Sequence, residues 1–384
     1  MARLVALALP PGRGFVDALR AAWDSGDAVL PVDLRLPDAA RRGLLAALRP
    51  AVLVTAEGRH DLPGAAPVAD GDAVVVPTSG TTGIPKGVVL THAAVEASAR
   101  ATSARLDVRP DRDRWLSCLP LAHIGGLAVV MRALVTGTPL DVLAAFDPRE
   151  VEDRARGGAT LVSLVATALG RTDASGFRVV LLGGAAPPSD LPANVVTTYG
   201  MTESGSGVVY DGTPLDGVQV VVGDGHRGRE GEILVRGPML LRAYRVPATT
   251  AGDVTEVDPR APDGWFATGD GGAFDATGRL HVHGRLAEVI VSGGEKVWPA
   301  PVEDALRQHP GVAEVAVWKR PDPEWGERVV AWVVPTDRSS VPGADELREQ
   351  VRSALPPWCA PKEVVVVDDL PRTPSGKVRR AHLT

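Results

Sequence analysis

The sequence predicts an α/β protein. We expect a large N-terminal part of parallel α/β sheets with a small β-barrel-like part, followed by a small α+β domain. Up to Gly212, apolar runs alternate with helical patterns, which is typical of parallel sheets. Beyond it, short strands are punctuated by Gly, Pro and Asp. After Arg285, helices and alternating strands form a unit of about one hundred residues, a normal domain size. The length of 384 residues fits two or three domains.

Strand–helix–strand units account for the first part. Strands Ala28–Val32 and Ala51–Thr55 flank a helix, Asp38–Leu48, whose leucines recur at helical spacing. The strand Val74–Val76 precedes a glycine-rich loop and an alanine-rich helix from about His92 to Leu106. Two later strands are Thr160–Val165 and Arg178–Leu182, and the second ends at Gly183 and Gly184. Ligands of open α/β sheets bind outside such strand ends.

The remaining elements are short. We expect strands at 218–222, 231–236 and 279–283, then helices at 301–308 and 344–355 and strands at 312–318, 329–334 and 364–367. We place the domain division after Gly284, giving domains 1–284 and 285–384.

Composition excludes several classes of protein. A net charge of −6 leaves no basic surplus for broad nucleic-acid binding. Cys118 and Cys359 are too few for a disulfide framework or a cysteine zinc cluster, and they suit a reducing compartment. The uncharged run Trp115–Met131 is broken by proline, histidine and glycines, so we expect buried core and no membrane span. Met1–Pro11 predicts a strand and not a secretory signal. We therefore expect a cytoplasmic protein.

The segment Thr78–Gly87 is the strongest chemical feature. Its glycines let the backbone approach a ligand, its hydroxyls donate hydrogen bonds, and Lys86 adds charge, which together suit a polyphosphate. It is not a Walker A loop, because Pro85 stands where that motif has glycine. The alternative is a hydroxyl-rich surface loop. Lysine is rare here, with five against 36 arginines, and Lys86 and Lys377 both lie in glycine-containing loops.

Five segments in order resemble the adenylate-forming superfamily of acyl-CoA synthetases, luciferases and peptide-synthetase adenylation domains. The first is the loop just described. The others are Tyr199–Glu203, Trp265–Asp270, Gly284–Arg285 with Ser292–Glu295, and Pro371–Lys377. The resemblance runs from about Trp23 to the end of the chain.

The resemblance implies a nucleotide site and a role for each of its residues. Glu203 would hold Mg²⁺, Thr202 would bind the α-phosphate, and Asp270 would accept the ribose hydroxyls with Arg285 nearby. The ring of Tyr199 would face adenine. The other implied nucleotide and thiol-channel residues are Thr78, Ser79, Gly80, Thr81, Thr82, Gly83, Lys86, Gly183, Gly184, Ala185, Gly200, Met201, Gly293, Gly294 and Glu295. Taken singly, a core tyrosine, a turn aspartate and a surface arginine remain the alternatives for Tyr199, Asp270 and Arg285.

Lys377 is the expected catalytic lysine, together with Thr202 and Glu203. Attack of a carboxylate on the α-phosphorus of ATP builds charge that a cation stabilises. The alternative is a solvated basic tail, because Arg379 and Arg380 follow. The resemblance also implies a mobile C-terminal domain that rotates near Arg285 and Ala287 between two half-reactions.

The acyl pocket is expected near His123, Arg132 and Gly205. Arg132 could pair with one carboxylate of a dianionic acid, or could be a helix-surface charge; His123 could equally be a core histidine. The segments that carry these residues, Leu119–Arg132 and Gly205–Val218, are similar to the o-succinylbenzoate–CoA ligase subgroup of menaquinone biosynthesis. Departures from the family pattern are Ala243 before Tyr244 and Ala287 where many relatives carry an acid.

The implied activity is an AMP-forming acid–CoA ligase that uses ATP, Mg²⁺ and CoA. The alternatives are another aryl- or fatty-acid–CoA ligase, an enzyme that loads a carrier protein, and a silent nucleotide-binding protein. The expected partners are small molecules, with neither nucleic acid nor membrane, and a homodimer is expected only from the prevalence of symmetric dimers.

Overall fold

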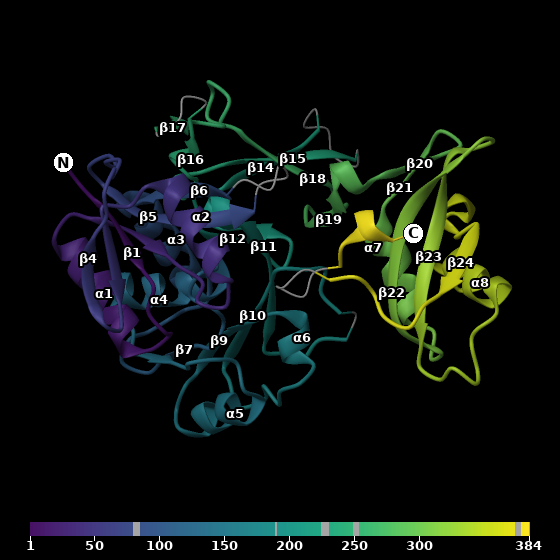
Figure 1. Cartoon of the computed structure of the whole chain (residues 1–384). Helices are drawn as coiled ribbons and strands as arrows, with labels where there is room; N and C mark the ends of the chain where they lie inside the picture. Colours follow the sequence, from purple (N-terminus) through teal and green to yellow (C-terminus); the bar gives the residue numbers. More distant parts are fainter. Residues whose placement is uncertain (80–84, 189, 224–229, 249–252, 373–377, 384) are drawn as a thin grey trace. The chain divides into compact units, whose positions relative to one another are not determined.

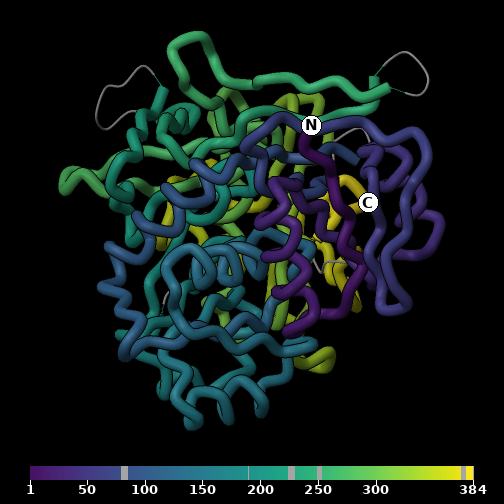
Figure 2. Tube along the Cα trace, turned by 90° about the vertical axis from the view of Figure 1, so that its left-hand side faces the viewer, coloured from purple at the N-terminus to yellow at the C-terminus, as the bar shows by residue number. Residues whose placement is uncertain are grey.

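The computed structural model describes residues 1–384 apart from 80–84, 189, 224–229, 249–252, 373–377 and 384. The chain forms two compact units: Met1–Val220 with Leu234–Ala267, and Val221–Ile233 with Thr268–Thr384. Figure 1 labels their elements, and the path of the chain can be followed in Figure 2. Among the described residues, no helix is long and apolar enough to cross a membrane.

The first sheet of the first unit is mixed, in the order β17-β16-β6-β5-β2-β1-β3-β4. Strands β5, β2, β1 and β3 run parallel, as expected, and antiparallel strands extend both edges. Helix α2 packs Leu44 and Leu48 into the core of this sheet. The bounds are β1 Leu4–Leu7, α1 Arg13–Asp24, β2 Ala28–Pro31, α2 Asp38–Leu48, β3 Val52–Thr55, β4 Gly58–Asp61, β5 Asp72–Ser79, β6 Pro85–Thr91, α3 His92–Arg105, β16 Ala243–Pro247 and β17 Val254–Val257.

The second sheet has the order β13-β12-β11-β10-β9-β7-β8, and strands β11, β10, β9, β7 and β8 are parallel up to the edge at β8. One core cluster on it includes Val129 and Ala133 of α4, and another includes Val151 of α5 and Ala168 of α6. The bounds are β7 Trp115–Ser117, α4 Ile124–Thr136, β8 Leu140–Val142, α5 Pro148–Arg156, β9 Leu161–Leu164, α6 Ala166–Leu169, β10 Val179–Leu182, β11 Val195–Met201, η1 Thr202–Ser204, β12 Ser206–Tyr210 and β13 Thr213–Pro214.

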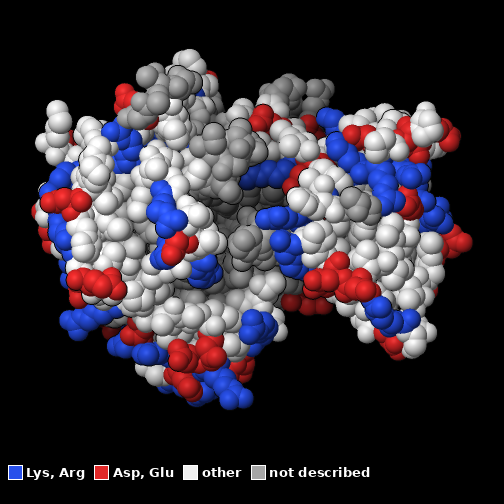
Figure 3. Space-filling view, viewed as in Figure 1, with Lys and Arg blue, Asp and Glu red and all other residues white. Residues whose placement is uncertain are grey.

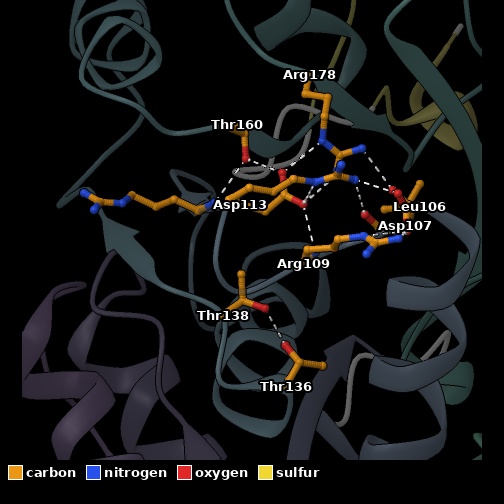
Figure 4. A network of polar contacts seen from close by, with 10 residues as sticks. Leu106, Asp107, Arg109, Asp113, Thr136, Thr138, Thr160 and Arg178 are labelled. Carbon is orange, nitrogen blue, oxygen red and sulfur yellow. Dashed lines mark hydrogen bonds and ion pairs between the residues drawn. The ribbon is translucent and has the colours of Figure 1, made fainter.

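A buried carboxylate, Asp113, ties segments of this second sheet together (Figure 4). Both of its oxygens accept hydrogen bonds from Arg178, at 2.9 and 2.8 Å, and Thr160 Oγ1 donates to it at 2.9 Å. Arg178 also donates to the carbonyl of Leu106. Burial opposes ionisation, but these donors and the backbone N–H of Arg109 hold the pKa of Asp113 below its ordinary value.

The barrel-like part is a four-stranded sheet of order β14-β15-β18-β19, whose edge strands β14 and β19 do not pair with each other among the described residues. Its strands are β14 Gln219–Val222, β15 Gly231–Arg236, β18 Phe266–Phe274 and β19 Leu280–Arg285. The second unit also holds a five-stranded sheet, β21-β20-β23-β22 with β24 beside β23. Its elements are η2 Leu286–Glu288, β20 Ile290–Ser292, β21 Glu295–Val297, α7 Pro299–Arg307, β22 Val312–Asp322, β23 Gly326–Pro335, α8 Ala344–Ala354, η3 Pro357–Cys359, β24 Glu363–Val366 and η4 Arg380–His382.

Candidate functional site

The phosphate-loop prediction falls on a β-hairpin. We expected a strand, a loop and then a helix, but a second strand, β6, comes between the loop and α3 and pairs antiparallel with β5. Thr78 lies opposite Lys86 in this pairing, and Ser79 lies opposite Pro85. Gly80, Thr81, Thr82 and Gly83 lie outside the described residues. The helix expected from about His92 is confirmed by α3, whereas strand β6, with Val88, Val89 and Leu90 buried, was not predicted.

Glu203 lies beside Lys86 at the edge of the first sheet. Glu203 follows β11 in the short helix η1, and its backbone carbonyl accepts a hydrogen bond from the N–H of Leu241. Lys86 Nζ lies 3.5 Å from Glu203 Oε1. The Tyr244 hydroxyl donates to the same oxygen at 2.8 Å, and Lys86 Nζ lies 3.7 Å from the centroid of the Tyr244 ring. Two of the predicted residues, 86 and 203, are thus neighbours, and Tyr244 joins them.

This carboxylate fits a hard divalent cation. Among the described residues, Glu203 Oε2 accepts no hydrogen bond, and the side chain keeps some exposure. A carboxylate oxygen with room for another ligand is what Mg²⁺ takes from proteins, alongside water and phosphate oxygens. Glu203 could therefore hold Mg²⁺, and Lys86 could bind a phosphate beside it.

Arg132 is buried in helix α4, and no carboxylate of the described residues pairs with it. Its side chain is 2% exposed, and it donates one hydrogen bond, to Ser206 Oγ at 3.2 Å. Its guanidinium lies 4.9 Å from the Trp115 ring, and its Nε has no hydrogen-bond partner in the part of the chain that the structure describes. Burial lowers the pKa of Arg132. The alternative of a helix-surface charge is therefore excluded by its burial.

A small cavity adjoins this guanidinium. Arg132, Gly205, Ser98 and Met131 are among its lining residues, and its free space of about 10 Å³ holds about one water. Gly205 has φ +68°, a conformation that favours glycine, and it follows η1 directly. The structure thus brings predicted residues 132 and 205 together. Gly205 lies two positions after Glu203 in the chain.

His123 lies apart from this cavity, at the start of helix α4. It is a half-exposed N-terminal cap residue, so the alternative of a core histidine does not hold. Its Nε2 lies 3.1 Å from an Arg35 nitrogen and 3.5 Å from Asp33 Oδ2. Arg35 also donates to both oxygens of Asp33, and these hydrogen bonds hold the pKa of Asp33 below its ordinary value.

Close backbone approach explains the glycines of the predicted adenine stretch. A Cβ on Gly200 would lie 2.1 Å from the Ser206 carbonyl oxygen, and one on Gly183 would lie 2.6 Å from Thr198 Oγ1. Gly184 has φ +87° and is exposed together with Ala185, just after β10. Tyr199, Gly200 and Met201 end the neighbouring parallel strand β11, and Thr202 begins η1. The predicted residues at 183–185 and 199–203 therefore follow or end adjacent strands, where α/β ligands bind.

The predicted ribose residues are paired in the second unit. Asp270 on β18 lies opposite Arg285 on β19, and Arg285 Nε lies 3.0 Å from Asp270 Oδ1. Arg285 also donates to the carbonyl of Thr268. Asp270 is 7% exposed, while the Arg285 side chain is 55% exposed. Asp270 is therefore a buried strand residue, and the guanidinium that pairs with it is accessible to solvent.

The glycines at 293 and 294 form the turn of the β20–β21 hairpin. Both have positive φ, at 63° and 89°, and Ser292 pairs with Glu295 across the turn. A Cβ on Gly293 would lie 2.6 Å from the Trp325 ring. Lys377 lies outside the described residues, but the segment that carries it is flanked by a bridge between Arg372 and Val378. Arg372 forms an ion pair with Glu314.

Sequence reasoning missed Tyr244, Asp33 and Arg35 as parts of these clusters. Tyr244 was notable only for the alanine before it. Its partner Glu203 is 41 positions away in the chain, so no local pattern could reveal the contact. Basic and acidic side chains are interspersed on the face seen in Figure 3, which agrees with the modest net charge.

Comparison with known proteins gives two family matches. Residues 60–245 match the model of the AMP-binding enzyme family, and residues 301–377 match that of the AMP-binding enzyme C-terminal domain. A probable 2-succinylbenzoate–CoA ligase of Mycobacterium tuberculosis is 42% identical over 337 residues, covering 82% of this chain and 84% of that protein.

Two solved structures of the Bacillus subtilis o-succinylbenzoate coenzyme A synthetase are also similar. One, in complex with the acyl-adenylate intermediate, has a TM-score of 0.84 at 28% identity and covers 100% of this chain and 88% of that one. The other, in complex with ATP and a magnesium ion, has a TM-score of 0.82 at 27% identity, with coverages of 99% and 89%.

Proposed function

This chain belongs to the AMP-binding enzyme family, and from that premise we propose that it is an ATP-dependent o-succinylbenzoate–CoA ligase acting in menaquinone biosynthesis. The reaction has two steps. The acid carboxylate attacks the α-phosphorus of Mg·ATP, giving an acyl-adenylate and pyrophosphate. The CoA thiol then attacks the acyl carbon, giving the thioester, AMP and a proton.

One observation carries the choice of a dicarboxylic substrate: the buried guanidinium of Arg132. A buried charge without a counter-ion is costly, and here it adjoins a cavity lined by Gly205. A substrate carboxylate would supply the missing partner and would satisfy the unpaired Nε. Glu203 immediately precedes Ser204 and Gly205 in the chain, so the proposed metal-binding carboxylate lies close in sequence to a residue that lines this cavity.

The other residues take the roles that the family resemblance implies. Lys86 and Thr78 with the loop residues bind the triphosphate, Thr202 binds the α-phosphate, and Tyr199 with Gly183, Gly184 and Ala185 surrounds adenine. Asp270 and Arg285 bind the ribose, in keeping with their pairing on adjacent strands. Lys377 stabilises the charge that develops at the α-phosphorus. Gly293, Gly294 and Glu295 border the thiol channel in the second step, after domain 285–384 rotates.

A substrate screen tests the proposal. Pyrophosphate release would be measured with o-succinylbenzoate, benzoate and medium-chain fatty acids, each with free CoA and with a phosphopantetheinylated carrier protein. We expect o-succinylbenzoate with CoA to give the highest kcat/KM. Preference for a monocarboxylic acid would replace the named substrate, and preference for the carrier would replace the acceptor. No acid-dependent pyrophosphate release would leave a silent nucleotide-binding protein.

We also propose a cytoplasmic homodimer. Both cysteines are buried and unpaired, which suits a reducing compartment. Symmetric dimers are the commonest homo-oligomers. Light scattering on the purified protein gives the mass directly, and a monomer at micromolar concentration would remove the dimer from the proposal.

A further inference from the structure

Tyr244 lies where three elements of the first unit meet. It belongs to β16, where it pairs with Val88 of β6, two residues from Lys86. Glu203 comes from η1, whose backbone is joined to Leu241 just before β16 by a 2.7 Å hydrogen bond. The phenol is therefore the side chain that touches both the metal-binding carboxylate and the loop lysine.

The geometry separates the charges of Lys86 and Glu203. At 3.5 Å, Nζ and Oε1 are farther apart than a charge-assisted hydrogen bond, which is about 2.7–2.9 Å long. The Tyr244 hydroxyl takes the hydrogen-bonding position on Oε1, and its ring face receives the ammonium. Lys86 and Glu203 therefore form a loose ion pair without a short direct hydrogen bond, and Tyr244 contacts both of its members.

The strand that carries Tyr244 is anchored independently of the site. Its neighbour Arg245 is buried and donates to the carbonyls of Leu48, Ala66 and Pro67. Arg242, just before the strand, binds both oxygens of Asp72. Because these contacts lie outside the Glu203 cluster, the position of the phenol is set by the fold and not by the ligand.

We propose that Tyr244 is a positioning residue for the nucleotide-bound metal. Its hydroxyl fixes Glu203 so that the second carboxylate oxygen faces the cation, and its ring holds Lys86 for the phosphates. The proposal rests on the proposed function, since it concerns the same Mg·ATP.

The test compares Tyr244→Phe with Tyr210→Phe. Tyr210 is a buried tyrosine of the same unit whose hydroxyl lies 3.0 Å from Thr102 Oγ1, so the control loses an equivalent group away from the cluster. Binding of Mn²⁺ would be followed by electron paramagnetic resonance in the presence of a non-hydrolysable ATP analogue and no acid. We expect Tyr244→Phe to weaken Mn²⁺ binding about tenfold, as for loss of a hydrogen bond to a charged group, and Tyr210→Phe to leave it unchanged.

Two further variants separate the contribution of the Tyr244 ring from that of its hydroxyl, and test whether the hydroxyl acts through Glu203. Tyr244→Leu should also weaken the ATP analogue without metal, by a further few-fold, since Lys86 loses the ring. In a Glu203→Gln background, Tyr244→Phe should add almost nothing, because its effect acts through Glu203. The Mg²⁺ concentration for half-maximal pyrophosphate release should rise with Tyr244→Phe in the same proportion as Mn²⁺ binding weakens.

The outcomes distinguish this inference from the proposed function. Equal Mn²⁺ binding by wild type and Tyr244→Phe, or full additivity with Glu203→Gln, would overturn the positioning role even if ligase activity is normal. The wild type could instead release no pyrophosphate with any acid while its binding of metal and ATP analogue still depends on Tyr244. That result would support the inference while the ligase proposal fails. Thermal unfolding of all variants shows whether a loss reflects misfolding.

Discussion

Replacing Arg132 by methionine should weaken substrate selection without weakening the fold. The guanidinium is 2% exposed, has one hydrogen bond and no ion pair among the described residues. Because this charge has no counter-ion to leave unpaired, exchanging it for an apolar group of similar length should change the free energy of unfolding little. The bound substrate, in contrast, loses the partner of a buried carboxylate, which costs about 2–5 kcal/mol and corresponds to a fall in kcat/KM of roughly 30-fold to 4000-fold.

The assay is pyrophosphate release with o-succinylbenzoate and with two matched monoacids, 4-oxo-4-phenylbutanoate and 2-butanoylbenzoate, each lacking one of its carboxylates. Arg132→Met should reduce kcat/KM for the diacid. It should reduce kcat/KM far less for whichever monoacid is adenylated. Arg132→Lys, which keeps the charge but not the planar fork, should fall between. Chemical denaturation of each variant gives the free energy of unfolding. The reasoning fails if Arg132→Met lowers kcat/KM equally for diacid and monoacid, or if it destabilises the protein by more than about 2 kcal/mol.

Three other perturbations are informative. Lys377→Ala should slow adenylation by roughly 10² or more while preformed acyl-adenylate still reacts with CoA; equal loss in both half-reactions would refute that division. Gly200→Ala should lower the free energy of unfolding by roughly 2 kcal/mol or more, because its Cβ would lie 2.1 Å from the Ser206 carbonyl oxygen. Gly43 lies inside helix α2 with nothing within 4 Å of an added Cβ, so Gly43→Ala should raise the free energy of unfolding by about 1 kcal/mol. Burial lowers the pKa of His92, so the unfolded chain takes up a proton first and stability should fall as pH drops below about 6.5; a His92→Gln variant with the same pH dependence would contradict this.

Local pattern was enough for the elements that build the scaffold. Helix α2 begins and ends where its leucine spacing placed it, and β15 matches its expected bounds. Strand β6 was missed because its apolar run of three residues follows a loop rich in glycine and leads straight into a helix. The run Val88–Leu90 was the signal that could have revealed it, but a run that short is ambiguous between strand and helix.

The candidate site was predictable in its residues and not in its contacts. Glu203 and Lys86 were singled out, but their meeting depends on the pairing of β16 with β6, which joins segments far apart in the chain. Arg132 was balanced between pocket and surface because periodicity shows which face a residue occupies and not what covers that face. Its burial excludes the surface alternative, and its place in the acyl pocket stays a prediction. The predicted domain division after Gly284, and the roles of Lys377 and the thiol channel, remain predictions.

The Asp113 cluster has a consequence for synthesis of the protein on the ribosome. Arg112, the neighbour of Asp113 in the chain, lies 3.6 Å from it, but the arginine that donates to both of its oxygens, Arg178, lies 65 positions later. A nascent chain that stops short of Arg178 therefore lacks the two hydrogen bonds that satisfy this buried acid. We therefore expect strands β7 and β9 to stay protease-sensitive in stalled chains until that arginine has emerged.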